Sequence, residues 1–347
     1  MKILIIKMSS LGDVIHTLPV LPPLRKKFPN ANIAWLIEEE IAELIIDHPL
    51  IERVLILPKK RWLGGLANCW KWPQIFQELF EFIEELRSIE YDLVIDFQGL
   101  FKSGIFTGIC RGKQKVGFFP AKEKSHIFLN KRVPFPRSPL HALERYIYLI
   151  ESLGCSRPEI EFLIPIRQSH RNKVLEFFRE KKIGPDDTIV LLHPGTRWKT
   201  KLWEEEKWAA LGDFLLQKRG IRVIFTGSYS DAPLVKRIIN RMKFTGIDAA
   251  GKWGLKELAF LQALADVIVI PDSGPMHLAA AMGTPVVALF GPTDPALTGP
   301  FGSIHKVIVS RVDCRPCFLR ECSSRRCMNQ ITVKEVWESI KPYLFKK

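Results

Sequence analysis

The stretch that decides the fold is Asp266–Gly291, DVIVIPDSGPMHLAAAMGTPVVALFG. Val267–Ile270 is a continuous β-branched run, which is typical of a strand buried on both faces. It leads through the polar turn Asp272–Pro275 into a helical segment, whose first turn tolerates proline because the missing N–H has no intrahelical partner there. Gly283 then ends the helix before a second apolar strand, Val286–Phe290. The stretch therefore predicts one strand–helix–strand unit of a parallel sheet.

The turn inside this unit is a candidate anion site. Asp272, Ser273 and Gly274 follow a strand and open a helix. Backbone N–H groups and the positive end of the helix dipole meet at such a turn, and parallel α/β proteins bind phosphorylated ligands at this edge of the sheet. An ordinary βαβ unit, in which Asp272 only caps the helix, fits the same residues.

Short apolar strands alternate with amphipathic helices along both halves of the chain, which favours two α/β domains with parallel sheets covered by helices. The expected strands are Ile3–Ile6, Ile33–Ile37, Val54–Leu57, Leu93–Ile95, Val116–Phe119, Ile189–His193 and Val223–Thr226. The segment Leu11–Phe28 is expected to contain a helix, and the other expected helices are Trp72–Ser88, Leu140–Leu153, Asn172–Lys181, Glu204–Arg219, Ala232–Met242 and Val333–Leu344. We expect an N-terminal domain over 1–160, a C-terminal domain over 161–330, and a helix within 331–347 that can pack back on the N-terminal domain.

Composition narrows the class of protein. The chain has 347 residues, 47% hydrophobic residues and a net charge of +14. This length allows two domains, and the positive charge suggests an anionic partner such as a nucleotide, a nucleic acid or an acidic lipid. No apolar run approaches the ~20 residues of a membrane span. The opening MKILIIK has too short an apolar core for a signal peptide, so we expect a cytoplasmic protein.

A second polar turn follows the first expected strand. Ser10 and Gly12 can cap and tighten the turn that opens the next helix. Asp13, in that first helical turn, is either a carboxylate favoured by the helix dipole or a general base that accepts a proton from a hydroxyl nucleophile.

A third polar turn, His193–Trp203, lies between a strand and a helix. Thr196 supplies a hydroxyl donor and Lys201 a cation that can bind a diphosphate. The spacing is not that of a Walker A loop, and the chain has no G-x-G-x-x-G, so a dehydrogenase-type dinucleotide site has no support. Asp231, after the next strand, either caps a helix or binds ribose hydroxyls. With a base in one half and diphosphate donors in the other, we expect a catalytic cleft between the two domains.

Four cysteines near the C-terminus form the pattern C-x2-C-x4-C-x4-C at Cys314, Cys317, Cys322 and Cys327. Four thiols can hold a structural zinc ion, although this spacing is tighter than that of common zinc ribbons. The alternative is a set of buried or redox-active thiols. No histidine or carboxylate pattern accompanies the cluster, so we expect no catalytic metal.

At these residues the chain resembles the ADP-heptose glycosyltransferases. The matching segments are KMSSLGDVIHTLP (7–19), WLIEEE (35–40), KKRW (59–62), DFQGLFKSG (96–104), HALER (141–145), GTRW with KLW (195–203) and PDSGPMHLAAAMGTPVVALFGPTDP (271–295). They are spread over nearly the whole chain in the family's order. The loop before Lys201 is about one residue longer than the family's pattern.

The resemblance implies a GT-B fold, with two Rossmann-like domains facing a cleft. It also implies inverting transfer of L-glycero-D-manno-heptose from ADP-heptose to a Kdo sugar of Kdo2-lipid A, with no cofactor required. By analogy, Asp13 and Lys201 are catalytic, as base and as the cation beside departing ADP. The implied donor-binding residues are Thr196, Asp231, Asp272, Ser273, Gly274 and His277, and the implied acceptor-binding residues are Ser10, Gly12, Lys60 and Arg61.

The acceptor of such a reaction is anionic. Residues 111–132 carry seven Lys or Arg and one Glu, and Lys59, Lys60 and Arg61 precede Trp62. These residues either capture the acceptor and hold the enzyme at the cytoplasmic face of the inner membrane, or form a solvated basic surface. Addition of the second heptose is the alternative within the family. The segments KKRW and DFQGLFKSG favour addition of the first heptose, to Kdo. A nucleic-acid-binding protein is a lower-ranked alternative, because the aromatic residues mostly occupy apolar periodic positions; we expect no nucleic-acid partner.

Overall fold

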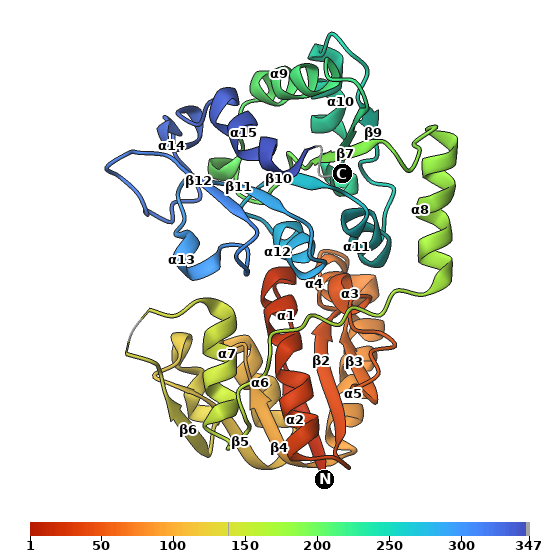
Figure 1. Ribbon diagram of the computed structural model, residues 1–347. Helices are drawn as coiled ribbons and strands as arrows, with labels where there is room; N and C mark the ends of the chain where they lie inside the picture. Colours follow the sequence, from red (N-terminus) through yellow and green to blue (C-terminus); the bar gives the residue numbers. More distant parts are fainter. Residues whose placement is uncertain (138, 345–347) are drawn as a thin grey trace. The chain divides into compact units, whose positions relative to one another are not determined.

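The computed structural model describes residues 1–137 and 139–344 and separates the chain into two compact units, Met1–Pro165 and Ile166–Lys347 (Figure 1). The boundary lies within five residues of the position expected from the sequence, at 160. Within the described residues each unit contains one six-stranded sheet in which all neighbouring strands are parallel. The α/β class predicted from the sequence is therefore confirmed.

The sheet of the first unit has the strand order β3-β2-β1-β4-β5-β6. Its strands are β1 (Lys2–Ile6), β2 (Asn32–Glu38), β3 (Arg53–Leu57), β4 (Glu90–Asp96), β5 (Arg111–Phe119) and β6 (Lys131–Pro134). The order reverses between β1 and β4, which are neighbours with Ile3 opposite Leu93. Such a reversal leaves a crevice at the carboxyl ends of the two strands, where doubly wound folds bind ligands.

The second unit repeats this topology, with the order β12-β11-β10-β7-β8-β9. Its strands are β7 (Thr188–Leu192), β8 (Ile221–Phe225), β9 (Ile247–Asp248), β10 (Val267–Pro271), β11 (Val286–Phe290) and β12 (Lys306–Val309). Counted from β7, this is the arrangement of the first sheet, and the reversal falls between β7 and β10. The β-branched strand β10 is buried along its whole length, as its sequence predicts.

The helices cover both sheets. In the first unit they are α1 (Leu11–Thr17), α2 (Leu21–Lys27), α3 (Glu39–Ala42), α4 (Lys59–Gly65), α5 (Trp72–Arg87), α6 (Phe101–Ile109) and α7 (Ala142–Glu151); in the second they are α8 (Gln168–Glu180), α9 (Glu205–Leu216), α10 (Ala232–Arg241), α11 (Leu255–Ala263), α12 (Gly274–Ala281), α13 (Pro295–Thr298), α14 (Arg326–Asn329) and α15 (Val333–Ile340). The segment Leu11–Phe28, expected to contain a helix, contains two, because a 3-10 turn, Leu18–Val20, separates α1 from α2. The prolines of this segment explain the division, because each removes an N–H donor from a helical turn.

The C-terminal helix α15 packs within the second unit. Val336 and Ile340 belong to the core that β7, β8, β10 and α9 also form, and Tyr343 donates a hydrogen bond of 2.6 Å to the Ile304 carbonyl. The helix expected within 331–347 thus packs in the core of the second unit, and its packing on the N-terminal domain stays a prediction. Residues 345–347 of that segment lie outside the described residues. No helix in the described ranges is long and apolar enough to cross a bilayer.

Candidate active site

Asp13 lies at the strand-order reversal of the first unit. It is the third residue of α1, directly after β1, and Ser10 is the N-cap. The Ser10 N–H and hydroxyl donate to Asp13 Oδ2 at 3.2 and 3.0 Å, which is a capping-box arrangement. About a third of the Asp13 side chain (35%) remains exposed. The carboxylate therefore caps the helix and is still accessible, so the two alternatives of the sequence analysis are compatible.

Two buried groups hold the other Asp13 oxygen. The Tyr146 hydroxyl, from α7, donates to Asp13 Oδ1 at 2.9 Å, and Lys7 Nζ lies 3.7 Å from the same oxygen. Lys7 also donates to the Tyr146 hydroxyl at 2.7 Å and to the Phe97 carbonyl at 3.3 Å. Lys7 is almost completely buried, whereas Asp13 is the exposed member of the pair. Hydrogen bonds to both oxygens therefore fix the carboxylate, which stays partly accessible to solvent.

These contacts shift the pKa values of the cluster. Burial alone would raise the pKa of Asp13, but the Lys7 charge, the Ser10 N–H and the Tyr146 hydroxyl outweigh it and lower that pKa well below the usual range. Burial lowers the pKa of Lys7, and the Asp13 and Asp96 charges oppose that shift. Burial and the neighbouring Asp13 charge raise the pKa of Tyr146 well above its usual value. Asp13 is accordingly ionised at neutral pH.

A second layer supports the turn. Gln98 Oε1, after β4, accepts hydrogen bonds from the N–H groups of Met8 and Ser9 at 3.2 and 3.1 Å. Asp96, the last residue of β4, accepts bonds from the Gln98 and Gly99 N–H groups, and burial raises its pKa to about 6. The segment DFQGLFKSG therefore connects the loop after β4 to the loop after β1.

Lysines from two helices meet Glu38 beside this turn. Lys102 of α6 donates to Ser9 Oγ at 2.7 Å and to Glu38 Oε1 at 2.9 Å, and Lys59 of α4 reaches the same Glu38 oxygen at 3.2 Å. Lys59 was named among the basic residues before Trp62 that could capture the acceptor, whereas Lys102 was given no role.

The expected acceptor residues are divided between two places. Ser10 and Gly12 lie in the turn with Asp13, as described. Lys60 and Arg61 lie on α4, where Lys60 is exposed and Arg61 forms an ion pair of 3.4 Å with Glu78 of α5. The residue of α4 that contacts Glu38, beside the Asp13 turn, is therefore their neighbour Lys59.

In the second unit, Lys201 and Asp272 form an ion pair at the corresponding reversal. Lys201, in a 3-10 turn after the β7 loop, lies 2.6 Å from Asp272 Oδ2, directly after β10. Both side chains are nearly buried, at 12% and 8% exposure. Thr293 donates to the same Asp272 oxygen at 2.7 Å, and Lys201 Nζ lies 4.4 Å from the centre of the Trp198 ring. Asp272 thus binds the cation and does not cap α12.

The N-terminus of α12 opens beside this pair. Ser273 is the N-cap and Gly274 the first helical residue, and the buried Ser273 hydroxyl has no hydrogen-bond partner among the described residues. Thr196 Oγ1 lies 3.4 Å from the Asp272 carbonyl oxygen, and His277 is buried one turn into the helix. The structure therefore brings Thr196, Lys201, Asp272, Ser273 and Gly274 to one edge of the sheet.

Asp231 adjoins this group through the β7 loop. Its carboxylate accepts hydrogen bonds from the Ser228 N–H and hydroxyl at 2.8 and 2.6 Å, so it does cap a helical turn. A Cβ on Gly195 would lie 2.4 Å from Asp231 Cγ, so only glycine allows this close approach of the loop. His193 bonds to Thr226 at 3.0 Å, and burial lowers its pKa to about 4, with the Asp231 charge opposing.

The cysteine pattern does not form a metal centre in the structure. Cys314 and Cys322 are exposed, Cys317 is half-buried and Cys327 is buried. Within residues 1–137 and 139–344, no three His, Cys, Asp or Glu side chains are grouped as metal ligands are. The four thiols as arranged do not fit a tetrahedral zinc site.

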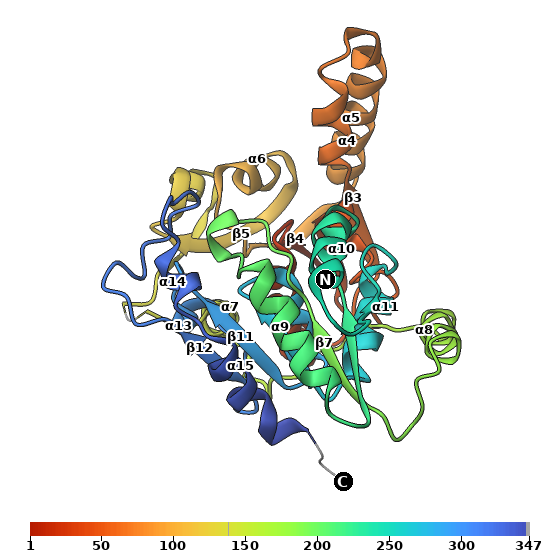
Figure 2. The same ribbon diagram turned by 90° about the horizontal axis from the view of Figure 1, so that it is seen from above.

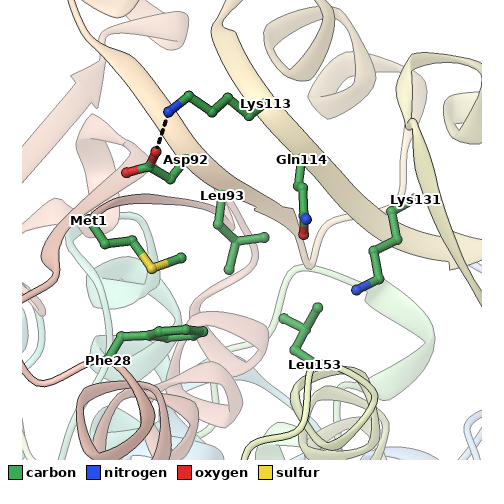
Figure 3. A pocket seen from close by; sticks show the side chains of 8 residues that line it. All are labelled: Met1, Phe28, Asp92, Leu93, Lys113, Gln114, Lys131 and Leu153. Carbon is green, nitrogen blue, oxygen red and sulfur yellow. Dashed lines mark hydrogen bonds and ion pairs between the residues drawn. The ribbon is translucent and has the colours of Figure 1, made fainter.

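A separate pocket of about 390 Å³ lies at the opposite edge of the first sheet (Figure 3). Met1, Asp92 and Lys131 lie near the amino ends of their strands, and Asp92 pairs with Lys113 at 2.8 Å. Ligands of doubly wound folds bind at the carboxyl ends, so this pocket is not part of the candidate site.

Among the side chains that contact Asp13 or Asp272, those of Lys7, Tyr146 and Thr293 were given no role by the sequence analysis. Lys7 had a detectable signal, because a lysine directly after a four-residue apolar strand must either be solvated or find a buried partner. Tyr146 stands in an apolar periodic helix, where a core tyrosine is the ordinary expectation, so nothing in its surroundings pointed to Asp13.

Known proteins resemble this chain over most of its length. Residues 79–328 match the model of glycosyltransferase family 9 (heptosyltransferase). The chain is 33% identical over 312 residues to lipopolysaccharide heptosyltransferase 1 of Escherichia coli K12, covering 88% of this chain and 93% of that protein. It is 30% identical over 330 residues to lipopolysaccharide heptosyltransferase 1 of Pseudomonas aeruginosa, covering 93% and 88%. The solved structure of E. coli heptosyltransferase WaaC with ADP superimposes with a TM-score of 0.77 and 29% identity, covering 99% of this chain and 100% of that one.

Proposed function

Because the chain belongs to glycosyltransferase family 9, the heptosyltransferases, we propose that it transfers heptose from ADP-heptose to Kdo of Kdo2-lipid A. The first unit would bind the acceptor, and the second would bind the donor. Relatives at 30–33% identity are named lipopolysaccharide heptosyltransferase 1, which supports this reaction over addition of a second heptose. A solved relative with ADP supports the choice of donor nucleotide.

The observation that carries the proposal is the accessible, ionised carboxylate of Asp13. A sugar hydroxyl is a weak nucleophile, and a carboxylate within hydrogen-bond reach can take its proton as the new bond forms. The acceptor oxygen would bond to the anomeric carbon while the bond from that carbon to the β-phosphate oxygen breaks. Attack from the side opposite ADP inverts the anomeric configuration. A base with a low pKa accepts the proton late, when the hydroxyl has already become acidic.

The second unit supplies the groups that departing ADP needs. Negative charge grows on the β-phosphate as the bond breaks, and a fixed cation and helix N–H groups stabilise it. The ammonium group of Lys201 would leave Asp272 and pair with the diphosphate. The hydroxyls of Thr196 and Ser273 and the Gly274 N–H would donate hydrogen bonds to the same diphosphate. Asp231, beside the Gly195 loop, would bind the ribose, and His277 would line the donor site. This set provides the positive charge without a required cofactor.

The acceptor would bind to the first unit. Ser10 and Gly12 would adjoin the reacting hydroxyl, and Lys60 and Arg61 would attract the acidic sugar and the lipid phosphates. The anionic, lipid-linked acceptor would place the protein in the cytoplasm, peripheral to the inner membrane. No nucleic-acid partner is part of this proposal.

The decisive experiment measures heptose transfer from ADP-heptose to Kdo2-lipid A by mass spectrometry of the lipid product. The wild-type protein is expected to add one heptose to Kdo2-lipid A and none to an acceptor that already carries it. Extension of the heptosylated acceptor alone would assign the second transfer instead. A folded protein that binds neither ADP nor ADP-heptose would overturn the proposal.

A further inference from the structure

The helical hairpin of α4 and α5 exposes an aromatic surface that the transfer reaction does not explain. It comprises α4, the loop through Trp70 and the first half of α5, and it projects from the rest of the first unit beyond β3 (Figure 2). Trp70 is 89% exposed, and Phe76 and Phe80 are each 60% exposed. Leu63, Leu66 and Trp72 are also exposed. Exposed large apolar side chains gathered on one element mark an interaction surface.

The exposed residues of α5 follow a helical repeat. Trp72, Phe76 and Phe80 are four residues apart and share one face of the helix. The face that packs on the core carries Phe82 and Leu86, which are buried. The apolar part of α5 is therefore wider than the core covers, and the additional stripe faces solvent.

The charges of the hairpin select the kind of partner. Residues 59–72 contain four Lys or Arg and no Asp or Glu. Arg61 is paired with Glu78, whereas Lys60 and Lys71 are exposed. Basic residues beside exposed Trp and Phe are the combination that binds anionic lipid at the level of the headgroups.

The hairpin is connected to the candidate site. Lys59 at the start of α4 contacts Glu38, and Glu38 contacts Lys102, which donates to Ser9 in the turn that holds Asp13. A lipid surface bound by the hairpin would thus lie against the same unit that carries the base.

We propose that the α4–α5 hairpin is a membrane-docking element that inserts Trp70, Phe76 and Phe80 into the headgroup region of an anionic bilayer. The proposal deepens the proposed function, because an enzyme whose acceptor is lipid-linked needs such a contact. It also rests on the hairpin's own exposure and charge, so the two can fail separately.

The test is co-sedimentation of the full chain with vesicles of phosphatidylethanolamine and phosphatidylglycerol, without donor or acceptor. The wild-type protein is expected to bind these vesicles and to bind phosphatidylcholine vesicles weakly. Replacing both aromatics (Trp70→Ser with Phe76→Ser) should weaken binding more than about tenfold. Lys71→Glu should weaken it several-fold, and more so at low salt. Trp72 is left intact, because its indole donates to the Leu66 carbonyl at 3.1 Å and closes the hairpin.

Matched changes elsewhere control for lost surface hydrophobicity. Phe244→Ser with Leu175→Ser removes two exposed apolar side chains from the second unit and should leave vesicle binding unchanged. With a water-soluble Kdo acceptor, the Trp70/Phe76 variant should match the wild-type kcat/KM, which also shows that it is folded.

Two results would overturn the docking proposal. One is equal vesicle binding by the wild-type protein and the Trp70/Phe76 variant, or binding by neither. The other is a wild-type dimer that the same variant dissolves, with no vesicle binding, which would assign the surface to a second copy. Vesicle binding without heptose transfer would instead overturn the proposed function and leave the docking element standing.

Discussion

The two units share one strand order and both place a lysine and an aspartate at its reversal, but the pairs are built in opposite ways. In the first unit Lys7 is buried at 3% exposure and Asp13 is open at 35%, with 3.7 Å between charged atoms. In the second unit Lys201 and Asp272 are both nearly buried and only 2.6 Å apart. The first pair exposes the carboxylate of Asp13, whereas the second keeps the ammonium group of Lys201 nearly buried against Asp272.

The difference follows from where each residue stands. Lys7 ends a buried strand, so its charge stays inside and serves to hold Asp13 through Tyr146. Lys201 comes from a loop above the sheet, where the ring of Trp198 and the carboxylate of Asp272 hold it in place. The proposed roles are a proton acceptor in the first unit and a charge stabiliser in the second, and each assignment can be tested by removing one member of the pair.

The largest effect is expected from Asp13→Asn. The amide still accepts a hydrogen bond through one oxygen but cannot take the hydroxyl proton, so kcat should fall about 10³-fold. The affinity for ADP should not change, because the donor is proposed to bind the other unit. Rates at saturating substrate and calorimetric titration with ADP measure the two quantities. If the activity of the variant is within a few-fold of the wild-type activity, Asp13 is not the base and only caps the helix.

Lys201→Ala should come next. Loss of one preorganised positive group beside the leaving diphosphate is expected to lower kcat about 10²-fold and to weaken ADP binding. The variant also leaves Asp272 buried without its partner, which should cost about 3 kcal/mol of unfolding free energy.

A double variant separates those two consequences. Lys201→Met with Asp272→Asn removes both charges, so denaturant unfolding should show most of the lost stability restored while the activity stays low. Recovery of activity in the double variant would contradict the role of Lys201 in catalysis.

Tyr146→Phe should have a smaller effect that depends on pH. The hydroxyl donates to Asp13 and lowers its pKa, so its removal should raise that pKa and move the acid limb of the kcat profile to higher pH. At neutral pH we expect kcat to fall about tenfold with KM nearly unchanged, because the carboxylate is less well held.

The pH dependence of the unfolding free energy should also move to higher pH in the Tyr146→Phe variant. A carboxyl group whose pKa is depressed by folding stabilises the protein above its unfolded pKa, and this contribution is lost as the pH falls through the folded value. In the Tyr146→Phe variant that loss should begin at a higher pH. Tyr148→Phe, the same change on the same helix, should leave the pH profile unaltered; identical profiles for all three proteins would remove Tyr146 from the site.

Much of the fold could be predicted from the sequence, because buried parallel strands are continuous apolar runs. The strands predicted from such runs agree with the structure to within a few residues; they include β1, β2, β3 and β10. The strands that were missed are β6, β9 and β12. Lys131–Pro134 is largely exposed and basic, and Ile247–Asp248 has only two residues, so neither carries an apolar signal.

The site was predictable where chemistry follows a strand end and unpredictable where it depends on packing. Asp13, Lys201 and Asp272 each follow a strand within one loop, and parallel topology gathers such residues at one edge. Tyr146 reaches Asp13 from 133 residues away in the chain, on a helix whose apolar face gives no sign of a polar target. The contact of Lys59 with Glu38 likewise depends on how α4 leaves β3.

The smallest effect is expected from removing metals. If Lys201 and the α12 N-terminus supply the charge that ADP needs, EDTA should change the rate of the wild-type protein by no more than about twofold.

Cys314→Ser with Cys322→Ser replaces two exposed thiols and should change the unfolding free energy by less than about 0.5 kcal/mol. A loss of activity in EDTA that added Zn²⁺ restores, and that the double serine variant reproduces, would assign a metal to the cysteines. The two Lys–Asp pairs would then no longer suffice to explain the chemistry, because a third region would contribute to it.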